Sequence, residues 1–259
     1  DDELFHVLAF EPSNPNSILT GVRAARENAR QVREQINQEM WQELNELYLR
    51  VGSADHSLDW TERNIELCED VIERAQLFTG ITDATMNHGQ GWQFIQVGRN
   101  LERSDATARM LDLESRVLWV KPESRLNAGQ PVFLAWLALL RSCAAFAAYS
   151  KIYTFDVQPT SIAEFLLLNG EFPRSAAFSI AAIHNALGAI SESTGAGRSN
   201  RPSRLAGRLQ AKLEYTDINE IITGGMGKFL VSLQHGCNEI HNAVYDRYIA
   251  YAPEEEGEI

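Results

Sequence analysis

The residues best suited to do chemistry in this 259-residue sequence are arginines that recur at helical spacing. Arg26, Arg30 and Arg33 are spaced i, i+4 and i+7, which places three guanidinium groups on one face of a predicted helix. Such like charges repel one another unless carboxylates or a ligand oppose them. Because guanidinium groups form paired hydrogen bonds with carboxylate and phosphate, the spacing predicts either an ion-pair network between helices or a pocket for an anion.

A second charged segment, residues 98–112, alternates cations with carboxylates. On a helix Arg99 neighbours Glu102 and Arg103, so opposite charges lie within reach of one another. A solvated helix face is the plainer interpretation. We instead expect Arg99, Glu102 and Arg103 to face a neighbouring helix, because their burial then requires mutual compensation. The residues predicted to form a structural ion-pair network are Arg23, Glu27, Arg99, Glu102, Asp105 and Arg109.

A third segment follows the helix stop Asn169-Gly170. Pro173 is predicted to lie in the first turn of a helix, where backbone N–H groups and Arg174 can face an anion. Alternatively, Arg174 pairs with Glu164 or Glu171 in a tight helix connection. The anion-binding residues predicted from the whole sequence are Arg26, Arg30, Arg103 and Arg174, which we expect to converge on one cleft.

Residues that would indicate standard catalysis are sparse. Cys68, Cys143 and Cys237 are odd in number and lack CxxC spacing, which supports neither a disulfide framework nor a zinc module and fits a reduced cytoplasm. Cys237 and His241 lie four residues apart, but two ligands are weak support for a metal. No nucleophile elbow or dinucleotide-binding glycine motif is present. No metal and no cofactor is therefore predicted, and the only candidates for an acid or base are Glu102 and Glu171.

Composition restricts the class of partner. The chain has 35 acidic residues against 23 Lys and Arg, a net charge of −12, which argues against nucleic acid or an anionic membrane as partner. Only four residues are lysines, so arginine supplies most of the positive charge. The strongest apolar run, residues 131–148, is interrupted by Arg141 and is short for a membrane span of about 20 residues. We expect it to form a central buried helix reaching about Tyr149.

Apolar residues recur at helical spacing almost throughout, and no segment alternates as a strand would. The predicted fold is all-α: a single multi-helix bundle-like domain with long helices and no β-sheet. It covers residues 1–252, and the acidic tail 253–259 is predicted to be disordered. The expected helices cover residues 18–51 with a jog near residue 35, 60–86, 92–119, 131–149, 161–168, 173–191, 202–213 and 218–251.

Several ordered blocks together resemble the bacterial alpha-E family, named for a predicted α-helical domain with a Glu-Arg motif. The blocks are LAF at 8–10, NPNSI at 14–18, RAARENAR at 23–30, EMW at 39–41, GRNLER at 98–103, LRSC at 140–143 and EFLLLNGEFPRS at 164–175. The resemblance implies that the family domain begins with a further helix that bears its own Gly-Arg-x-x-Glu-Arg segment. Such a helix has no counterpart in this sequence, which we interpret as truncated at its N-terminus.

The resemblance also implies a functional context. Alpha-E proteins are fused to, or encoded beside, a circularly permuted ATP-grasp ligase, often with a transglutaminase-like peptidase. This implies a cytoplasmic accessory or scaffold protein that binds the ligase or an anionic substrate through its arginines. The alternative is an enzyme of amide-bond formation or transfer, in which Glu102 or Glu171 acts as acid or base and arginines orient a carboxylate. The residues favour the accessory protein, while the substrate and the oligomeric state stay open.

Overall fold

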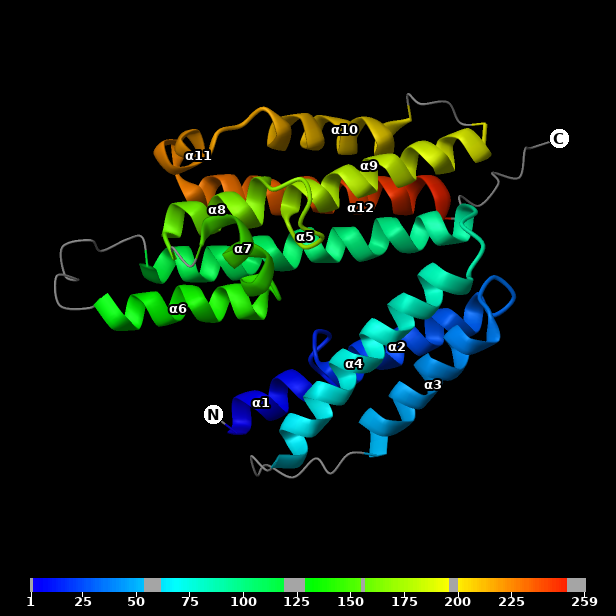
Figure 1. Ribbon diagram of the computed structural model, residues 1–259. Coiled ribbons are helices and arrows are strands. Elements are labelled where there is room, and N and C mark those ends of the chain that lie inside the picture. Colours follow the sequence, from blue (N-terminus) through cyan, green and yellow to red (C-terminus); the bar gives the residue numbers. More distant parts are fainter. Residues whose placement is uncertain (1, 54–61, 119–128, 155–156, 196–199, 251–259) are drawn as a thin grey trace. The chain divides into compact units, whose positions relative to one another are not determined.

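A computed structural model of the chain describes residues 2–53, 62–118, 129–154, 157–195 and 200–250. Within these ranges the chain forms twelve α-helices and no strand, which confirms the all-α prediction (Figure 1). The helices divide into two compact units, residues 1–92 and 93–259. That residues 1–252 form one continuous body stays a prediction. The predicted acidic tail, 253–259, lies outside the described residues.

The first unit contains four helices. They are α1 (Asp2–Ala9), α2 (Ile18–Gln31), α3 (Gln38–Ser53) and α4 (Glu62–Thr85). Ser17 caps α2, because its hydroxyl accepts a hydrogen bond from the backbone N–H of Thr20 at 3.2 Å. The predicted jog near residue 35 is a full break, so the expected helix 18–51 is two helices.

The core of the first unit joins α2 to α3. Leu19 and Val22 from the start of α2 pack with Leu47 and Val51 from the end of α3, so the two helices run antiparallel. Partly buried residues of α4 close this core on another side, including Leu67 and Val71. The turn before α2 is fixed to α1, since the Asn14 side chain donates to the carbonyl of Val7 at 2.9 Å.

The second unit begins within α5 (Gln90–Leu118) and holds the larger core. Its other helices are α6 (Gly129–Ser142), α7 (Phe146–Tyr153), α8 (Pro159–Leu168), α9 (Ala176–Ser193), α10 (Arg201–Glu214), α11 (Ile218–Gly224) and α12 (Met226–Tyr248). Helix α10 packs against both α9 and α12 (Figure 1). Along the α10–α12 contact, a Cβ at Gly236 would lie 3.0 Å from the side chain of Leu209, so the glycine allows a close approach.

Two separate contacts show that helices α5 and α12 run antiparallel. The rings of Phe94 and Tyr248 meet edge to face with centroids 5.4 Å apart. Ten residues further along α5, the Sγ of Cys237 lies 3.6 Å from the Oγ of Ser104. A one-sided run of buried apolar residues on α5 produces this pairing: Val97, Leu101, Ala108 and Leu111.

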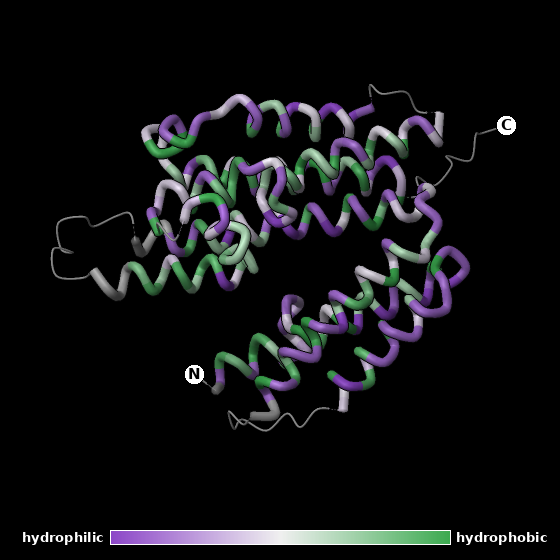
Figure 2. Tube along the Cα trace, viewed as in Figure 1, coloured by the Kyte–Doolittle hydropathy of each residue, from purple (hydrophilic) through white to green (hydrophobic). Residues whose placement is uncertain are grey.

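The prediction of one central buried helix over residues 131–149 is wrong. The chain breaks after Ser142, where Ala144 adopts a left-handed conformation with φ of 50°, and α7 leaves α6 at an angle of 120°. Although α6 is hydrophobic along most of its length (Figure 2), Phe133 and Leu134 are 46% and 59% exposed. Leu140 is fully buried. Apolar composition alone does not distinguish a fully buried helix from one with an exposed apolar face.

Helix α8 has the buried character that the sequence analysis assigned to α6. Five of its ten residues have at most 1% of their surface exposed: Ile162, Ala163, Phe165, Leu166 and Leu167. Three further boundaries differ from prediction. Helix α9 begins at Ala176 with Ser175 as its N-cap, so Pro173 precedes the helix. The expected helix 218–251 is divided at Gly225, whose φ of +101° favours glycine, and its second part ends at Tyr248.

Among the described residues, no single helix is both long and apolar enough to cross a membrane. The bent pair Phe133–Ser142 and Phe146–Tyr153 reaches the required length and composition only when the two helices are taken together.

Candidate functional site

Arg26, one of the predicted anion-binding residues, lies against α3 in the first unit. Its Nε donates a hydrogen bond of 2.8 Å to Oδ1 of Asn45. Its guanidinium carbon lies 4.6 Å from the ring centroid of Tyr48 and 5.5 Å from that of Trp41. These three α3 residues are spaced i, i+4 and i+7, so one helix face supplies all three of these contacts. Arg26 is therefore held in place by two rings and an amide.

The neighbouring arginines of α2 behave differently. Arg30 pairs with Glu27, with Nη2 and Oε1 2.6 Å apart, and its side chain is 63% exposed. This contact lowers the pKa of Glu27, first through the hydrogen bond from Arg30. Arg23 is exposed on the same helix. The Glu27–Arg30 pair is a surface contact of the kind that contributes little to stability.

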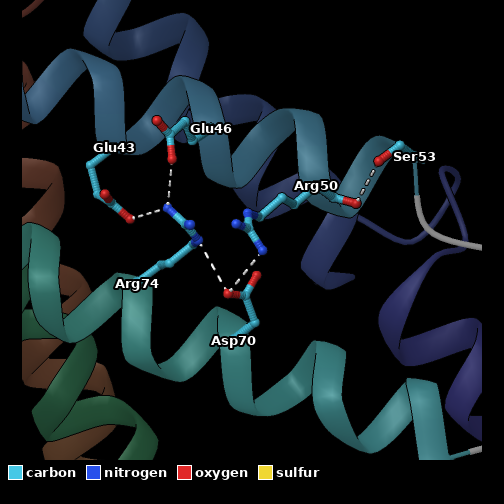
Figure 3. Close-up of polar contacts among 6 residues, drawn as sticks. All are labelled: Glu43, Glu46, Arg50, Ser53, Asp70 and Arg74. Carbon is cyan, nitrogen blue, oxygen red and sulfur yellow. Dashed lines mark hydrogen bonds and ion pairs between the residues drawn. The ribbon is translucent and has the colours of Figure 1, made fainter.

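The most buried ion-pair network described joins α3 to α4 around Arg74 (Figure 3). Its Nη1 lies 2.8 Å from Glu43 and 3.1 Å from Glu46, while its Nε lies 3.2 Å from Asp70. The side chains of Arg74 and Glu43 are only 15% and 10% exposed. Arg50 approaches Asp70 at 3.5 Å from the more exposed end of the network.

This network is electrostatically closed, which means that its own carboxylates already compensate the charge of Arg74. Burial by itself lowers the pKa of Arg74, but the hydrogen bond and charge of Glu43, together with Asp70, outweigh burial and raise it. Three carboxylates already surround the one buried guanidinium, so an added anion would be repelled. The Arg74 cluster is consequently a structural device that fastens α3 to α4.

On α5 the charged segment is only partly turned away from water. Arg99 and Arg103 are half-buried, whereas Glu102 is exposed. The expectation that all three face a neighbouring helix is therefore wrong for Glu102. Arg99 donates to the side-chain oxygen of Gln96 one turn earlier. Asp105 and Arg109 form the expected pair, with the carboxylate oxygen and Nε 2.6 Å apart.

The turn between α8 and α9 positions Arg174. Asn169 Oδ1 accepts hydrogen bonds from the backbone N–H groups of Glu171 and Phe172, at 2.9 and 2.8 Å. The hydroxyl of Ser175 donates to the carbonyl of Asn169, so both ends of the turn are tied together. An asparagine that bonds to the backbone two residues later is typical of a tight turn. The structured turn makes the half-buried Arg174 part of a fixed surface.

This turn is attached to α5 and lies near the α6–α7 break. The hydroxyl of Thr107 donates a 2.9 Å hydrogen bond to the carbonyl oxygen of Arg174. Thr107 follows Arg103 by one helical turn, so the backbone of Arg174 is attached to α5 one turn from Arg103. Arg174 also lowers the pKa of the Cys143 thiol by its charge. The structure thus brings together residues from the segments 98–112, 140–143 and 164–175.

The buried thiols are not activated nucleophiles. Burial raises the pKa of Cys143 to about 11, and the opposing effect of Arg174 is smaller. Burial likewise raises the pKa of Cys237 to about 11, despite its hydrogen bond with Ser104. A thiol is nucleophilic as the thiolate, so both groups are almost wholly protonated near neutral pH.

The two candidate catalytic carboxylates, Glu102 and Glu171, are both exposed. Glu164, predicted as an alternative partner of Arg174, instead accepts a hydrogen bond from the Tyr153 hydroxyl at 3.3 Å. Burial, and then the charge of Glu164, raise the pKa of Tyr153 to about 12. In the part of the chain that the structure describes, no three His, Cys, Asp or Glu side chains gather closely enough to hold a metal ion. The His241 side chain is exposed while Cys237 is buried.

Sequence reasoning missed Arg74, the face of α3 that holds Arg26, and a pocket beside α9. The spacing of Asp70 and Arg74 at i, i+4 was a readable signal for the first. The pocket has a volume of about 390 Å³ and is lined by His184, Asn185, Gly188, Ala189, Glu192 and Ser203. Its walls come from α9 and α10, and helical periodicity alone does not predict which two helices will meet.

The fold defines an all-α protein that carries several arginine-rich segments. Comparison with known proteins identifies its family. Residues 1–249 match the Alpha-E family, described as a predicted alpha-helical domain with a conserved ER motif. The chain belongs to this family. It is 22% identical over 250 residues to the uncharacterized protein Mb2597 of Mycobacterium bovis and to the uncharacterized proteins MT2643 and Rv2567 of Mycobacterium tuberculosis. Each alignment covers 92% of this chain but 26% of the relative. No solved structure matches.

Proposed function

We propose that this chain is a helical binding module of an amide-ligase system. It binds a circularly permuted ATP-grasp ligase, or the anionic substrate of that ligase, through the arginines around Thr107. A transglutaminase-like peptidase is a further proposed partner. The ligase is proposed as partner on the basis of the family resemblance. The arginines are proposed as the binding groups because a guanidinium fork binds carboxylate and phosphate through two parallel hydrogen bonds.

The observation that carries this proposal is the hydrogen bond from Thr107 to the carbonyl of Arg174. It fastens the turn 169–175 to α5, one helical turn from Arg103. An arginine on a fixed turn loses less conformational entropy on binding than one on a loose loop. Arg26 and Arg30 were predicted for the same cleft. They belong to the other unit, so the proposal depends on Arg103 and Arg174 alone.

Binding is favoured over catalysis by the state of the candidate reactive groups. The pKa of each buried thiol is raised to about 11, which opposes thiolate formation. The candidate carboxylates Glu102 and Glu171 are exposed, so burial does not set either of them apart as a general acid.

The length of the relatives supports a module that works beside other domains. This chain spans about a quarter of each mycobacterial protein that it matches. A domain found within a much longer polypeptide lies close to the remaining domains at high effective concentration. A surface that binds a partner domain fits this arrangement.

Calorimetric titration of the chain with a purified circularly permuted ATP-grasp ligase tests the proposal. Arg103→Ala and Arg174→Ala should each weaken binding by about 1.5–3 kcal/mol, the contribution of a charge-assisted hydrogen bond. Arg208→Ala, which removes an exposed arginine of α10, is the matched control and should leave the affinity unchanged. Circular dichroism establishes that each variant is folded. Undiminished binding by the folded double variant, or the absence of binding to the ligase and to its acidic substrates, would refute the proposal.

A further inference from the structure

The face of α3 that holds Arg26 also approaches a second arginine. Arg33 lies in the connection after α2, and its guanidinium carbon is 5.7 Å from the ring centroid of Trp41. Arg26 lies 5.5 Å from the same centroid. Two like charges therefore share one indole ring. Cation–π contacts partly stabilise each guanidinium but do not neutralise it.

Neither guanidinium forms an ion pair with a carboxylate among the described residues. Arg26 uses its Nε for Asn45, a neutral amide, which leaves the two Nη groups of its fork for other acceptors. Arg33 directs Nη1 towards the carbonyl oxygen of Ile36 at a long 3.5 Å. Both arginines retain donors with which to bind an anion.

Arg74, in the same unit, has the opposite surroundings to Arg26, because its partners are carboxylates. Helix α3 presents Glu43 and Glu46 to Arg74, and Asp70 of α4 completes its set of carboxylates. The adjacent face of α3 presents aromatic rings and an amide to Arg26. The nearest carboxylate effect comes from α2, where the charge of Arg26 helps to lower the pKa of Glu27, which is itself paired with Arg30. An arginine packed between two helices of this unit can thus have carboxylate partners, as Arg74 does, whereas α3 offers none to Arg26. Helix α3 has one electrostatically closed face and one open face.

We propose that Arg26 and Arg33, whose guanidinium groups both contact the ring of Trp41, form a binding site for a single carboxylate of a peptide. The ring supplies a flat apolar surface beside the two cations, which suits a carboxylate attached to an apolar residue. The carboxylate comes either from the C-terminus of the peptide or from a glutamate side chain. A bound carboxylate offsets the repulsion between the two guanidinium groups.

The net negative charge of the first unit favours a single carboxylate over a polyanion as the ligand of this site. Residues 1–92 contain 17 Asp and Glu, seven Arg and no Lys. This excess of negative charge repels an acidic tract or a polyphosphate over the whole unit. A single carboxylate is attracted by the two nearby guanidinium groups, while more distant charges are screened beyond about 8–10 Å at physiological salt. The fork of arginine also matches the planar carboxylate better than the point charge of lysine does.

This site is independent of the ligase-binding surface proposed above, because it uses other arginines in the other unit. Its test uses small peptides and no ligase. The probes are acetyl-Leu-Ala-Ala with a free C-terminal carboxylate, the same peptide as its amide, and acetyl-Leu-Glu-Ala amide. Binding is followed by NMR through the indole N–H of Trp41, assigned with Trp41→Phe, and the Nε–H of Arg26.

The free-acid peptide, the glutamyl amide, or both should shift these signals, while the neutral amide should not. The responding peptide identifies the source of the carboxylate. Arg26→Ala and Arg33→Ala should each weaken binding at least fivefold, and Arg26→Lys should weaken it as well because the fork is lost. Arg23→Ala removes an exposed arginine of the same helix and should have no effect.

Arg33→Ala keeps the test valid if Arg26→Ala disturbs the α2–α3 packing, since Arg33 lies outside both helices. Thermal unfolding establishes the fold of each variant. Three results would each overturn the proposal: equal shifts with the neutral amide, full affinity in folded Arg33→Ala, or a stronger response to inorganic phosphate than to either carboxylate peptide. Loss of peptide binding in Arg33→Ala with unchanged ligase binding would support the site and leave the ligase proposal intact.

Discussion

The Nη1 atom of Arg74 lies 2.8 Å from the Oε1 atom of Glu43, and this contact joins two helices that are separated by a connection of eight residues. Both side chains are largely removed from water. Opposite charges so placed depend on one another, because either charge alone would lose hydration without compensation. The pair therefore specifies which face of α4 packs on α3.

Arg74→Ala should destabilise the protein by about 2–3 kcal/mol, between the small effect of an exposed ion pair and the 3–5 kcal/mol of a fully buried pair. The cause is the uncompensated carboxylate of Glu43. Urea unfolding measures the change. Arg50→Ala is the control, since Arg50 is 54% exposed and 3.5 Å from Asp70, and it should change stability by less than about 0.5 kcal/mol. Recovery of stability in the double variant Arg74→Met with Glu43→Leu would establish the electrostatic cause.

Leu140→Ala should cost about 2–5 kcal/mol, because Leu140 is fully buried in the core of the second unit and its truncation leaves a cavity. Leu134→Ala changes the same kind of residue on the same helix, but Leu134 is 59% exposed. It should alter stability by less than about 0.5 kcal/mol. Thermal unfolding of the two variants compares the faces of α6. Equal destabilisation would contradict the one-sided burial of this helix.

Alkaline pH should destabilise the fold through Cys143 and Cys237. The pKa of each rises in the folded state from an ordinary value of 9.0 to about 11. Below pH 9 both states hold the proton and stability is complete. Between pH 9 and 11 only the unfolded state releases it, so each thiol lowers the free energy of unfolding by about 1.4 kcal/mol per pH unit.

Urea unfolding at pH 8, 9 and 10 measures this slope. The variant with Cys143→Ala and Cys237→Ala is compared with the parent protein, since other groups also titrate at high pH. The difference in stability between the two proteins should shrink as the pH rises. A difference that stays constant over this range would show that these thiols have ordinary pKa values in the folded protein.

Thr107→Val should destabilise the second unit by about 1–3 kcal/mol, because the carbonyl of Arg174 loses its hydrogen-bond donor in a site where Thr107 is only 3% exposed. Valine preserves the shape of threonine, so the loss is polar rather than steric. Thr107→Ser retains the hydroxyl and should restore most of the bond. Hydrogen exchange of the amides in the turn 169–175 should accelerate in the valine variant and not in the serine variant.

Helical periodicity was sufficient to predict the all-α class, and cap and turn residues located several boundaries. Ser17 begins α2 as predicted, because a serine before an apolar-periodic segment can satisfy a free backbone N–H group. The prediction failed where a break has no strong sequence signal. Ala144 adopts a left-handed conformation that alanine rarely takes, so residues 131–149 read as one helix.

The candidate sites show the same division. The sequence alone determined that arginine carries most of the positive charge and that Arg26, Arg30 and Arg33 recur at helical spacing. Only the tertiary structure decided their roles: Arg30 pairs with Glu27, whereas Arg26 lies over the rings of α3. Spacing along one helix fixes which side chains share a face. Whether a carboxylate, a ring or solvent meets that face depends on how a second helix packs against it. The spacing of residues within one helix carries no information on that packing.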